Sequence, residues 1–335
     1  MSDFERAENF NQAITVLGEN VRKRLEYIGT SQKAAVQEVR LRIGCPLQVT
    51  QRGNTLYVTQ EGKITDKAGN LCYEVTRQDV EESFRAICGY SVHTHQNEVK
   101  NGYITVRGGH RAGICGTAVI DNGEVSGIKD ISSINLRIAQ QMTGCAGKML
   151  PSQVLYSEKS LILAGPPCSG KTTLLRDTAR ALSGMGIRVA VVDERSEISA
   201  MYQGKAQNKL GSCCDVLNGY PKPFGIMTAL RALSPQVILC DEIGDLREIE
   251  QIQSGFYSGV RFIITLHATD MEGIRRKPGM KELLAGGEFG YAVFLGAGEN
   301  LGKTVSMEVL GEKTNENHGT CVDDMRVASD GIFAL

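Results

Sequence analysis

Apolar and polar residues follow different rhythms along the first 150 residues. Over residues 1–37 the apolar positions recur every three or four residues, which predicts helix. Residues 38–66 switch to short alternating runs separated by Gly, Pro and Asn, which is typical of strands and tight turns. A further helix, with Thr as its N-cap, is predicted over residues 76–88, and a glycine-punctuated hairpin over residues 102–120. The pattern therefore predicts a small α+β domain over residues 1–150.

The pattern changes after Pro151 to an alternation of strand, loop and helix, which is typical of a parallel sheet with crossover helices. The expected strands are residues 160–164, 187–192, 236–240, 260–266, 291–295 and 305–310. The expected helices lie near residues 171–183, 225–233 and 245–257. We therefore predict a second, α/β domain with a parallel central sheet over residues 151–311, followed by a loosely ordered polar tail over residues 312–335.

Composition narrows the class of protein. Of the 335 residues 41% are hydrophobic and 22% charged, and 37 Lys and Arg stand against 38 Asp and Glu. This balance excludes a protein that works mainly as a polycation on nucleic acid or an anionic membrane. The ten cysteines show no Cys-x-x-Cys pair, which is typical of reduced cysteines. There is no signal-peptide pattern and no apolar run of the ~20 residues that span a bilayer, so we expect a cytoplasmic protein.

Residues 165–172, Gly-Pro-Pro-Cys-Ser-Gly-Lys-Thr, match the phosphate-binding motif G-x-x-x-x-G-K-[ST], between an apolar strand and a helix as that motif requires. Gly165 and Gly170 let backbone N–H groups turn inward around a phosphate at the positive end of the helix. Lys171 is expected to reach the β- and γ-phosphates, and the Thr172 hydroxyl to bind Mg²⁺. We therefore expect ATP and Mg²⁺ as cofactors. The predicted nucleotide-binding residues are Gly165, Pro166, Pro167, Cys168, Ser169, Gly170, Lys171, Thr172 and Thr173.

Two adjacent carboxylates, Asp241 and Glu242, end the apolar strand predicted at 236–240. Asp241 is predicted to hold Mg²⁺ through its water shell. Glu242 is predicted to point at the γ-phosphate and polarise the attacking water. The intact pair favours the branch of P-loop ATPases with an extra strand between the phosphate strand and the Mg²⁺ strand. The alternative is a pair of solvated carboxylates at a strand end.

Polar side chains follow two other predicted strands. His267 follows strand 260–266, and the C-terminal ends of parallel strands converge on a ligand. His267 is therefore predicted to sense the γ-phosphate or position water, the alternative being a packed histidine. Glu194 and Glu197 follow strand 187–192, where they either assist at the metal or belong to a solvated loop.

Longer strings resemble known families. Residues 230–231 (Leu-Arg), Pro235 and residues 241–245 (Asp-Glu-Ile-Gly-Asp) resemble a stretch of the secretion ATPases of the type II and type IV pilus kind. Residues 265–268 (Thr-Leu-His-Ala) resemble their His box. From about residue 35 to 310 the chain more closely resembles the stage III sporulation protein AA family of endospore-forming Firmicutes. The strings that carry this resemblance are residues 38–47, 108–113, 134–139 and 192–198.

The resemblance implies a RecA-like P-loop ATPase domain (of the AAA/RecA kind) in a mother-cell ATPase. It implies that ATP hydrolysis powers a secretion-like channel complex at the boundary between mother cell and forespore. It also implies a ring of six subunits and a membrane-bound partner that recruits the cytoplasmic protein to the membrane periphery. The chain departs from the secretion ATPases at Asp241, where they usually carry Gly, and at Gly244, where they usually carry Arg.

Transition-state charge on the γ-phosphate is normally met by an arginine from the same chain or a neighbour. In secretion ATPases such arginines tend to come from the N-terminal domain across the subunit boundary. The resemblance therefore favours Arg111 and Arg137 as catalytic residues, with Arg107, Arg195 and Arg231 also open. For each of them the alternative is a surface or packing arginine.

Two other classes of function stay open. One is a nucleic-acid-handling P-loop ATPase, which the basic residues 22–24 and the loop 107–111 favour. Near-neutral charge and the lack of an evident aromatic stacking platform argue against it. The other is a nucleotide-switched structural adaptor that binds ATP without turning it over. Glu242 argues against the adaptor, because a pure binder has no need of a water-polarising carboxylate.

Overall fold

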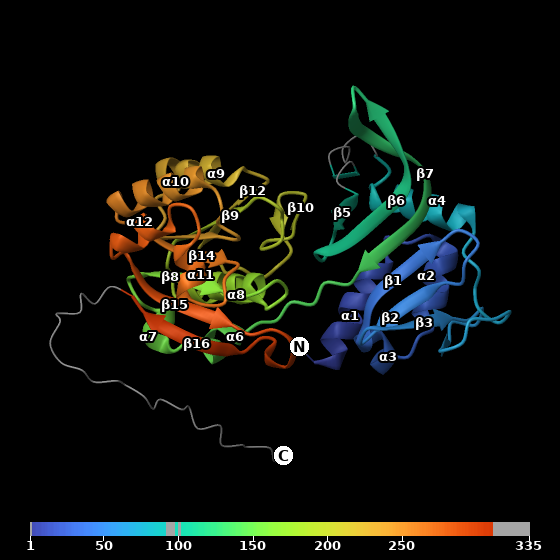
Figure 1. The fold of residues 1–335 in the computed structure, drawn as a ribbon. Coiled ribbons are helices and arrows are strands. Elements are labelled where there is room, and N and C mark those ends of the chain that lie inside the picture. Colours follow the sequence, from blue (N-terminus) through green and yellow to red (C-terminus); the bar gives the residue numbers. More distant parts are fainter. Residues whose placement is uncertain (1, 92–97, 100–101, 311–335) are drawn as a thin grey trace, which may run out of the picture.

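The computed structural model describes residues 2–91, 98–99 and 102–310, which are arranged as two lobes joined by a short connector (Figure 1). The tail expected over residues 312–335 lies outside the described residues. None of the helices in these ranges combines the length and the apolar character that a membrane span requires.

The N-terminal lobe, up to residue 138, is built on an antiparallel sheet with the strand order β4–β3–β2–β1–β7–β6–β5. Its strands are β1 (Val36–Arg42), β2 (Gln48–Gln51), β3 (Asn54–Val58), β4 (Ile64–Thr65), β5 (Tyr103–Val106), β6 (His110–Asp121) and β7 (Glu124–Arg137). Its helices are α1 (Asp3–Ile14), α2 (Glu19–Glu26), α3 (Thr30–Ala35) and α4 (Arg77–Ile87). Apolar residues of the helices and of the strands share one core.

The helical period predicted over residues 1–37 is divided among α1, α2 and α3. Gly18 and Gly29 take the N-cap positions of α2 and α3. Their backbone is not helical, so the chain changes direction before each helix. A Cβ at Gly18 would lie 3.1 Å from the Cβ of Glu82 on α4, so this glycine lets α2 approach α4 closely. The apolar positions of the period are buried as predicted, except for Phe4, which is exposed.

The hairpin predicted over residues 102–120 is present, and its strands continue further than expected. β5 pairs with the start of β6, as far as Val106 opposite His110. β6 then pairs with β7, which the sequence pattern did not predict, and the β6–β7 ribbon stands out from the lobe in Figure 1. Val119 and Ile120 are exposed on this ribbon. Because neither face of the ribbon tip is buried there, its sequence shows no clear alternation.

The C-terminal lobe is built on a sheet with the order β12–β9–β13–β14–β8–β15–β16, in which all neighbours are parallel except β15 and β16. Its strands are β8 (Ser160–Ala164), β9 (Val189–Asp193), β12 (Cys214–Asn218), β13 (Val237–Cys240), β14 (Arg261–Leu266), β15 (Phe289–Leu295) and β16 (Thr304–Val309). β10 (Met201–Tyr202) and β11 (Lys205–Ala206) form a separate small hairpin.

Helices cover both faces of this sheet (Figure 1). One face carries α6 (Cys145–Met149), α7 (Ser152–Leu155) and α8 (Lys171–Gly184). The other carries α9 (Lys222–Ala232), α10 (Leu246–Tyr257), α11 (Met271–Arg275) and α12 (Met280–Ala285), and η2 (Gly298–Asn300) precedes β16. Every residue of β8, β9 and β13 is buried, and coverage of both faces explains why these strands are apolar apart from Ser160 at the start of β8 and Asp193 at the end of β9. It is the doubly covered parallel sheet that the sequence predicts.

The strand order confirms one specific prediction and adds one strand. β14 lies between β8, which leads into the phosphate motif, and β13, which leads into the carboxylate pair. This is the extra strand expected from the intact pair. β12, at the sheet edge, was not predicted, because its half-buried residues include polar ones and form no apolar run.

Residues of the connector pack with the C-terminal lobe. The core of the N-terminal lobe includes Ile138, and the core around α8 takes in residues from Ala146 onward. The Asp177 carboxylate on α8 accepts hydrogen bonds from the N–H groups of Gly144 at 3.0 Å and of Ala146 at 2.7 Å. The packing of the second lobe therefore begins a few residues before the boundary expected at residue 151.

Candidate active site

The phosphate motif forms the loop between β8 and α8. Gly170, the N-cap of α8, has a φ of 94°, and Cys168 has a φ of 58°. Left-handed backbone at these positions curls the loop around the helix N-terminus, as an anion-binding loop requires. At Gly165 a Cβ would lie 2.6 Å from Ser169 Oγ and 2.9 Å from the carbonyl oxygen of Leu295, so a larger residue does not fit. The predicted nucleotide-binding residues thus form one loop and the first turn of α8.

Lys171 is held inside this loop. Its ammonium group donates to the carbonyl oxygens of Gly165 at 3.0 Å and Pro166 at 2.8 Å, and lies 3.2 Å from His267 Nδ1. Burial lowers the pKa of Lys171, while the negative charges of nearby carboxylates act in the opposite direction. A buried ammonium whose partners are neutral carbonyls and an imidazole is well suited to exchange them for phosphate oxygens.

Hard oxygen ligands converge beside the loop. The Thr172 hydroxyl donates to Asp241 Oδ2 at 2.6 Å, and the Thr265 hydroxyl donates to Asp241 Oδ1. Thr265 Oγ also accepts a hydrogen bond from the Glu242 N–H at 2.7 Å. A hydroxyl and a carboxylate fit Mg²⁺, which takes one or two protein ligands together with substrate phosphates. Thr265 was not predicted as a site residue. A threonine among apolar residues at the end of a strand could have indicated a polar role at the site.

Glu242 has a φ of 51°, a conformation uncommon outside glycine. Its Oε1 lies 3.0 Å from His267 Nε2 and its Oε2 lies 3.2 Å from an Arg195 nitrogen. Burial acts to raise the pKa of Glu242, but the hydrogen bond from His267 and the positive charges of Arg195 and Lys171 outweigh it and hold the pKa below its ordinary value. The structure thus brings together Lys171, Thr172, Asp241, Glu242 and His267.

The two arginines expected to be catalytic lie in ion pairs with other carboxylates. An Arg111 nitrogen is 3.6 Å from Glu197 Oε1, and its guanidinium stacks 3.4 Å above the Tyr103 ring. Arg137 is 3.0 Å from Glu38 Oε1 on β1, with most of its side chain exposed. Arg111 therefore contacts the C-terminal lobe within one chain, whereas Arg137 is turned toward its own sheet.

The loop after β9 is held by the carboxylate of Asp193, the last residue of that strand. Asp193 accepts hydrogen bonds from three successive backbone N–H groups, at residues 197–199, at 2.9, 3.2 and 2.7 Å. Glu194 faces the ammonium group of Lys222 at 3.7 Å. Together with the pairing of Glu197 described above, these contacts direct both loop glutamates to cations of the protein.

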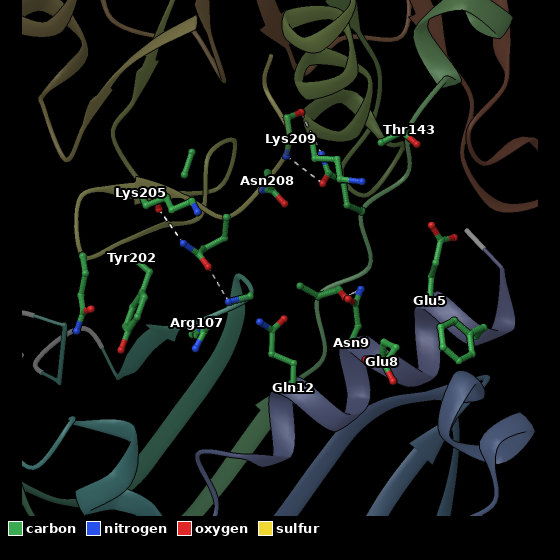
Figure 2. Close-up of a pocket in the computed structure, with 17 residues that line it drawn as sticks. Glu5, Glu8, Asn9, Gln12, Arg107, Thr143, Tyr202, Lys205, Asn208 and Lys209 are labelled. Atoms are coloured by element: carbon green, nitrogen blue, oxygen red, sulfur yellow. Dashed lines mark hydrogen bonds between the residues drawn. The ribbon is translucent and has the colours of Figure 1, made fainter. Parts of the chain in front are cut away.

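A polar cleft of about 820 Å³ lies between α1 and the segment 201–209 (Figure 2). Within its lining, the Gly108 N–H donates to Gln207 Oε1 at 2.8 Å. Gln141 of the connector exchanges hydrogen bonds of 3.2 and 3.0 Å with the backbone of Lys209. The charged residues that line the cleft are Glu5, Glu8, Arg107, Lys205 and Lys209. The two lobes therefore meet here through polar contacts.

A phosphate loop at the end of one parallel strand, a carboxylate pair at the end of another and a strand between them define the fold of the P-loop ATPases. The chain belongs to the family of sporulation stage III, protein AA, whose model matches residues 6–313. It is 36% identical over 279 residues to Stage III sporulation protein AA of Bacillus subtilis (strain 168), covering 82% of this chain and 86% of that relative. The family resemblance seen in the sequence is confirmed.

Solved structures of an ATPase and of a pilus motor share this fold. The pilus retraction motor PilT with bound ADP has a TM-score of 0.55 and 17% identity, covering 82% of this chain and 76% of that one. The Legionella pneumophila ATPase DotB has a TM-score of 0.53 and 15% identity, covering 82% and 75%. At these identities the likeness shows the fold, and it confirms the predicted fold class.

Proposed function

We propose that this chain is a Mg²⁺-dependent ATPase that hydrolyses ATP to ADP and phosphate. We propose further that the hydrolysis powers a secretion-like channel complex at the boundary between mother cell and forespore. The observation that carries the enzymatic proposal is that His267 contacts the P-loop Lys171 through one ring nitrogen and Glu242 through the other. Family membership supports the sporulation role, and the secretion-ATPase fold supports the role at a channel.

The contacts support a simple reaction. Lys171 turns from the loop carbonyls to the β- and γ-phosphate oxygens. Glu242, ionised because of its low pKa, orients a water and accepts its proton while the water oxygen bonds to the γ-phosphorus and the bond to the ADP oxygen breaks. The proton then passes from Glu242 to the released phosphate. Thr172 and Asp241 would hold Mg²⁺, which neutralises charge on the phosphates.

His267 links the two charged groups of the reaction. Its Nδ1 faces the Lys171 ammonium, which can only donate, so Nδ1 accepts. Its Nε2 faces the Glu242 carboxylate and therefore carries the proton. A neutral ring in this tautomer satisfies both partners. When Lys171 moves to a phosphate, His267 loses one partner and keeps its contact with Glu242, which supports a role in sensing the γ-phosphate.

The ring and the partner are part of the proposal. We propose a homo-oligomeric ring, with six subunits implied by the family resemblance, in which Arg111 or Arg137 reaches the γ-phosphate of a neighbouring subunit. Both lie on the N-terminal lobe, as a cross-subunit arginine of secretion ATPases does, and Arg195 is the arginine already beside Glu242 in the same chain. We also propose that the protein is cytoplasmic and is recruited to the membrane by a membrane-bound partner.

Phosphate release at saturating ATP and Mg²⁺ is expected to rise per subunit as protein concentration rises, because the transition-state arginine is worth roughly 10³–10⁵ in rate and comes from a neighbour. The measurement is steady-state turnover across a dilution series, with sedimentation at each concentration and with EDTA as the Mg²⁺ control. A rate that is negligible at every concentration, despite tight nucleotide binding, would contradict hydrolysis by the isolated protein and favour the nucleotide-switched adaptor.

The acid limb of the kcat/KM profile is expected to move to higher pH in Arg195→Gln. The Arg195 charge helps to keep the pKa of Glu242 below its ordinary value, so removing it raises that pKa and Glu242 becomes protonated at higher pH. The measurement is a pH–rate profile beside Arg247→Gln, whose guanidinium pairs with Asp245 at the surface. If the acid limb of Arg195→Gln coincides with that of the wild type, Glu242 is not the group whose protonation causes the acid limb.

A further inference from the structure

A largely buried lysine that the sequence did not single out lies close to the carboxylate pair. The ammonium group of Lys222, at the start of α9, donates to the carbonyl oxygen of Glu242 at 2.8 Å and to Glu248 Oε1 at 3.2 Å. Only 13% of its side chain is exposed. Lys222 therefore holds the main chain of Glu242, while the carboxylate of Glu242 stays free to face His267 and Arg195.

Glu248 stabilises the turn that follows Glu242, at residues 242–245. Its second oxygen accepts hydrogen bonds from the N–H groups of Gly244 at 2.7 Å and Asp245 at 3.0 Å, and the residue is 7% exposed. Lys222 and Glu248 together thus fasten the turn at both ends. Such fastening is required because Glu242 occupies left-handed backbone that a non-glycine residue keeps only when its surroundings hold it there.

The start of α9 is itself rigidly placed. Pro221 and Pro223 flank Lys222, and proline fixes φ near the helical value. At Gly225 a Cβ would lie 2.4 Å from a methyl group of Val192, so α9 sits tightly against β9. Lys222 therefore reaches the turn from a position with little backbone freedom, which lowers the entropy lost in forming its contacts.

Lys222 also lines a small pocket beside the pair. This pocket, about 20 Å³ in volume, is walled by carboxylates and by cationic side chains, among them Glu194, Arg195, Lys222, Asp241 and Glu242. Its volume and polar walls suit a single water molecule. The lysine that fixes the Glu242 main chain thus borders the space beside the carboxylate in which a water can be oriented.

We propose that Lys222 is a positioning residue for ATP hydrolysis, which acts by holding the Glu242 main chain, with Glu248 as its partner. This inference rests on the proposed ATPase activity. Lys222 neither takes the proton nor contacts the phosphates in this assignment. Its loss therefore affects the orientation of the water-activating carboxylate and leaves the phosphate loop intact.

Lys222→Met is expected to lower kcat roughly tenfold to hundredfold, because hydrogen bonds to charged groups are lost in a buried site. KM for ATP and the affinity for ADP, measured by fluorescence titration, are expected to stay within about twofold, since Lys171 and Thr172 are untouched. Lys222→Arg keeps the charge and the donors, so it is expected to restore most of kcat. Lys281→Met, at an exposed lysine on α12, is the matched control and is expected to equal the wild type.

A kcat for Lys222→Met equal to that of the wild type, or a loss that Lys222→Arg fails to reduce, would overturn the positioning role. A parallel loss of ADP affinity would do the same, because it would show damage to the whole site. If Lys222→Met does not fold, Glu248→Gln replaces it and is expected to show the same selective loss of kcat. A wild type without Mg²⁺-dependent hydrolysis would instead overturn the proposed function, and the positioning role with it.

Discussion

Glu242→Gln is expected to lower kcat for ATP hydrolysis by roughly 10²–10⁴-fold and to leave nucleotide binding nearly unchanged. Glutamine has the shape of glutamate but cannot accept the proton of the attacking water. Lys171, Thr172 and the phosphate loop keep their hydrogen bonds in this variant, so ATP and ADP still have their binding groups. The measurements are steady-state phosphate release and titration with a fluorescent nucleotide, both in Mg²⁺.

Glu250→Gln, at an exposed position of α10, is the matched control and is expected to behave as the wild type. Mixing Glu242→Gln with Arg111→Ala, or with Arg137→Ala, then tests the ring. If the arginine acts across a subunit boundary, mixed rings contain some complete sites, and activity returns to a pair of variants that are each inactive. A Glu242→Gln protein with half of the wild-type rate would show that Glu242 does not accept the proton.

Thr265→Val is expected to lower kcat roughly 10- to 100-fold and to raise the Mg²⁺ concentration needed for half-maximal activity. Valine fills the same buried space at the end of β14 and suits a strand. It lacks the hydroxyl, however, that donates to Asp241 and accepts from the Glu242 N–H. Both members of the carboxylate pair thereby lose a partner. The measurements are kcat against Mg²⁺ concentration and ADP affinity.

Thr265→Ser supplies the comparison for this variant. It keeps the hydroxyl and removes a methyl group, so it is expected to retain most of the activity at a cost of about 1 kcal/mol in the free energy of unfolding. If Thr265→Ser and Thr265→Val lose activity to the same extent, packing at the end of β14 would explain the loss. The hydroxyl bridge between Asp241 and Glu242 would then have no part in hydrolysis.

The sequence predicted much of the fold because its signals are local. An apolar run, a glycine loop and an amphipathic stretch locate β8, the phosphate loop and α8 without reference to the rest of the chain. The carboxylate pair follows from a single strand end. Even the place of β14 between β8 and β13 was predicted, because the order of strands accompanies this type of carboxylate pair in P-loop ATPases.

What the sequence did not show depends on contacts between distant segments. Lys222 reaches Glu242 from 20 positions earlier in the chain, and Thr265 reaches Asp241 from another strand. The direction of Arg137 toward Glu38 depends on the antiparallel register of β1 and β7, which pairs Arg137 with Glu38. Such neighbours are decided by the pairing of strands and by packing, and no spacing along the chain encodes them directly.

The Asp193 carboxylate, which gathers three successive amides, has a mechanical consequence. It stiffens the stretch that begins at Arg195, beside Glu242, and continues to Gln207, which holds Gly108 in the other lobe. This stretch connects the carboxylate of Glu242 at one end with the N-terminal lobe at the other. A small displacement of Glu242 would then be transmitted along this stretch to the N-terminal lobe. The polar cleft between α1 and the segment 201–209 leaves space for the two lobes to move relative to each other.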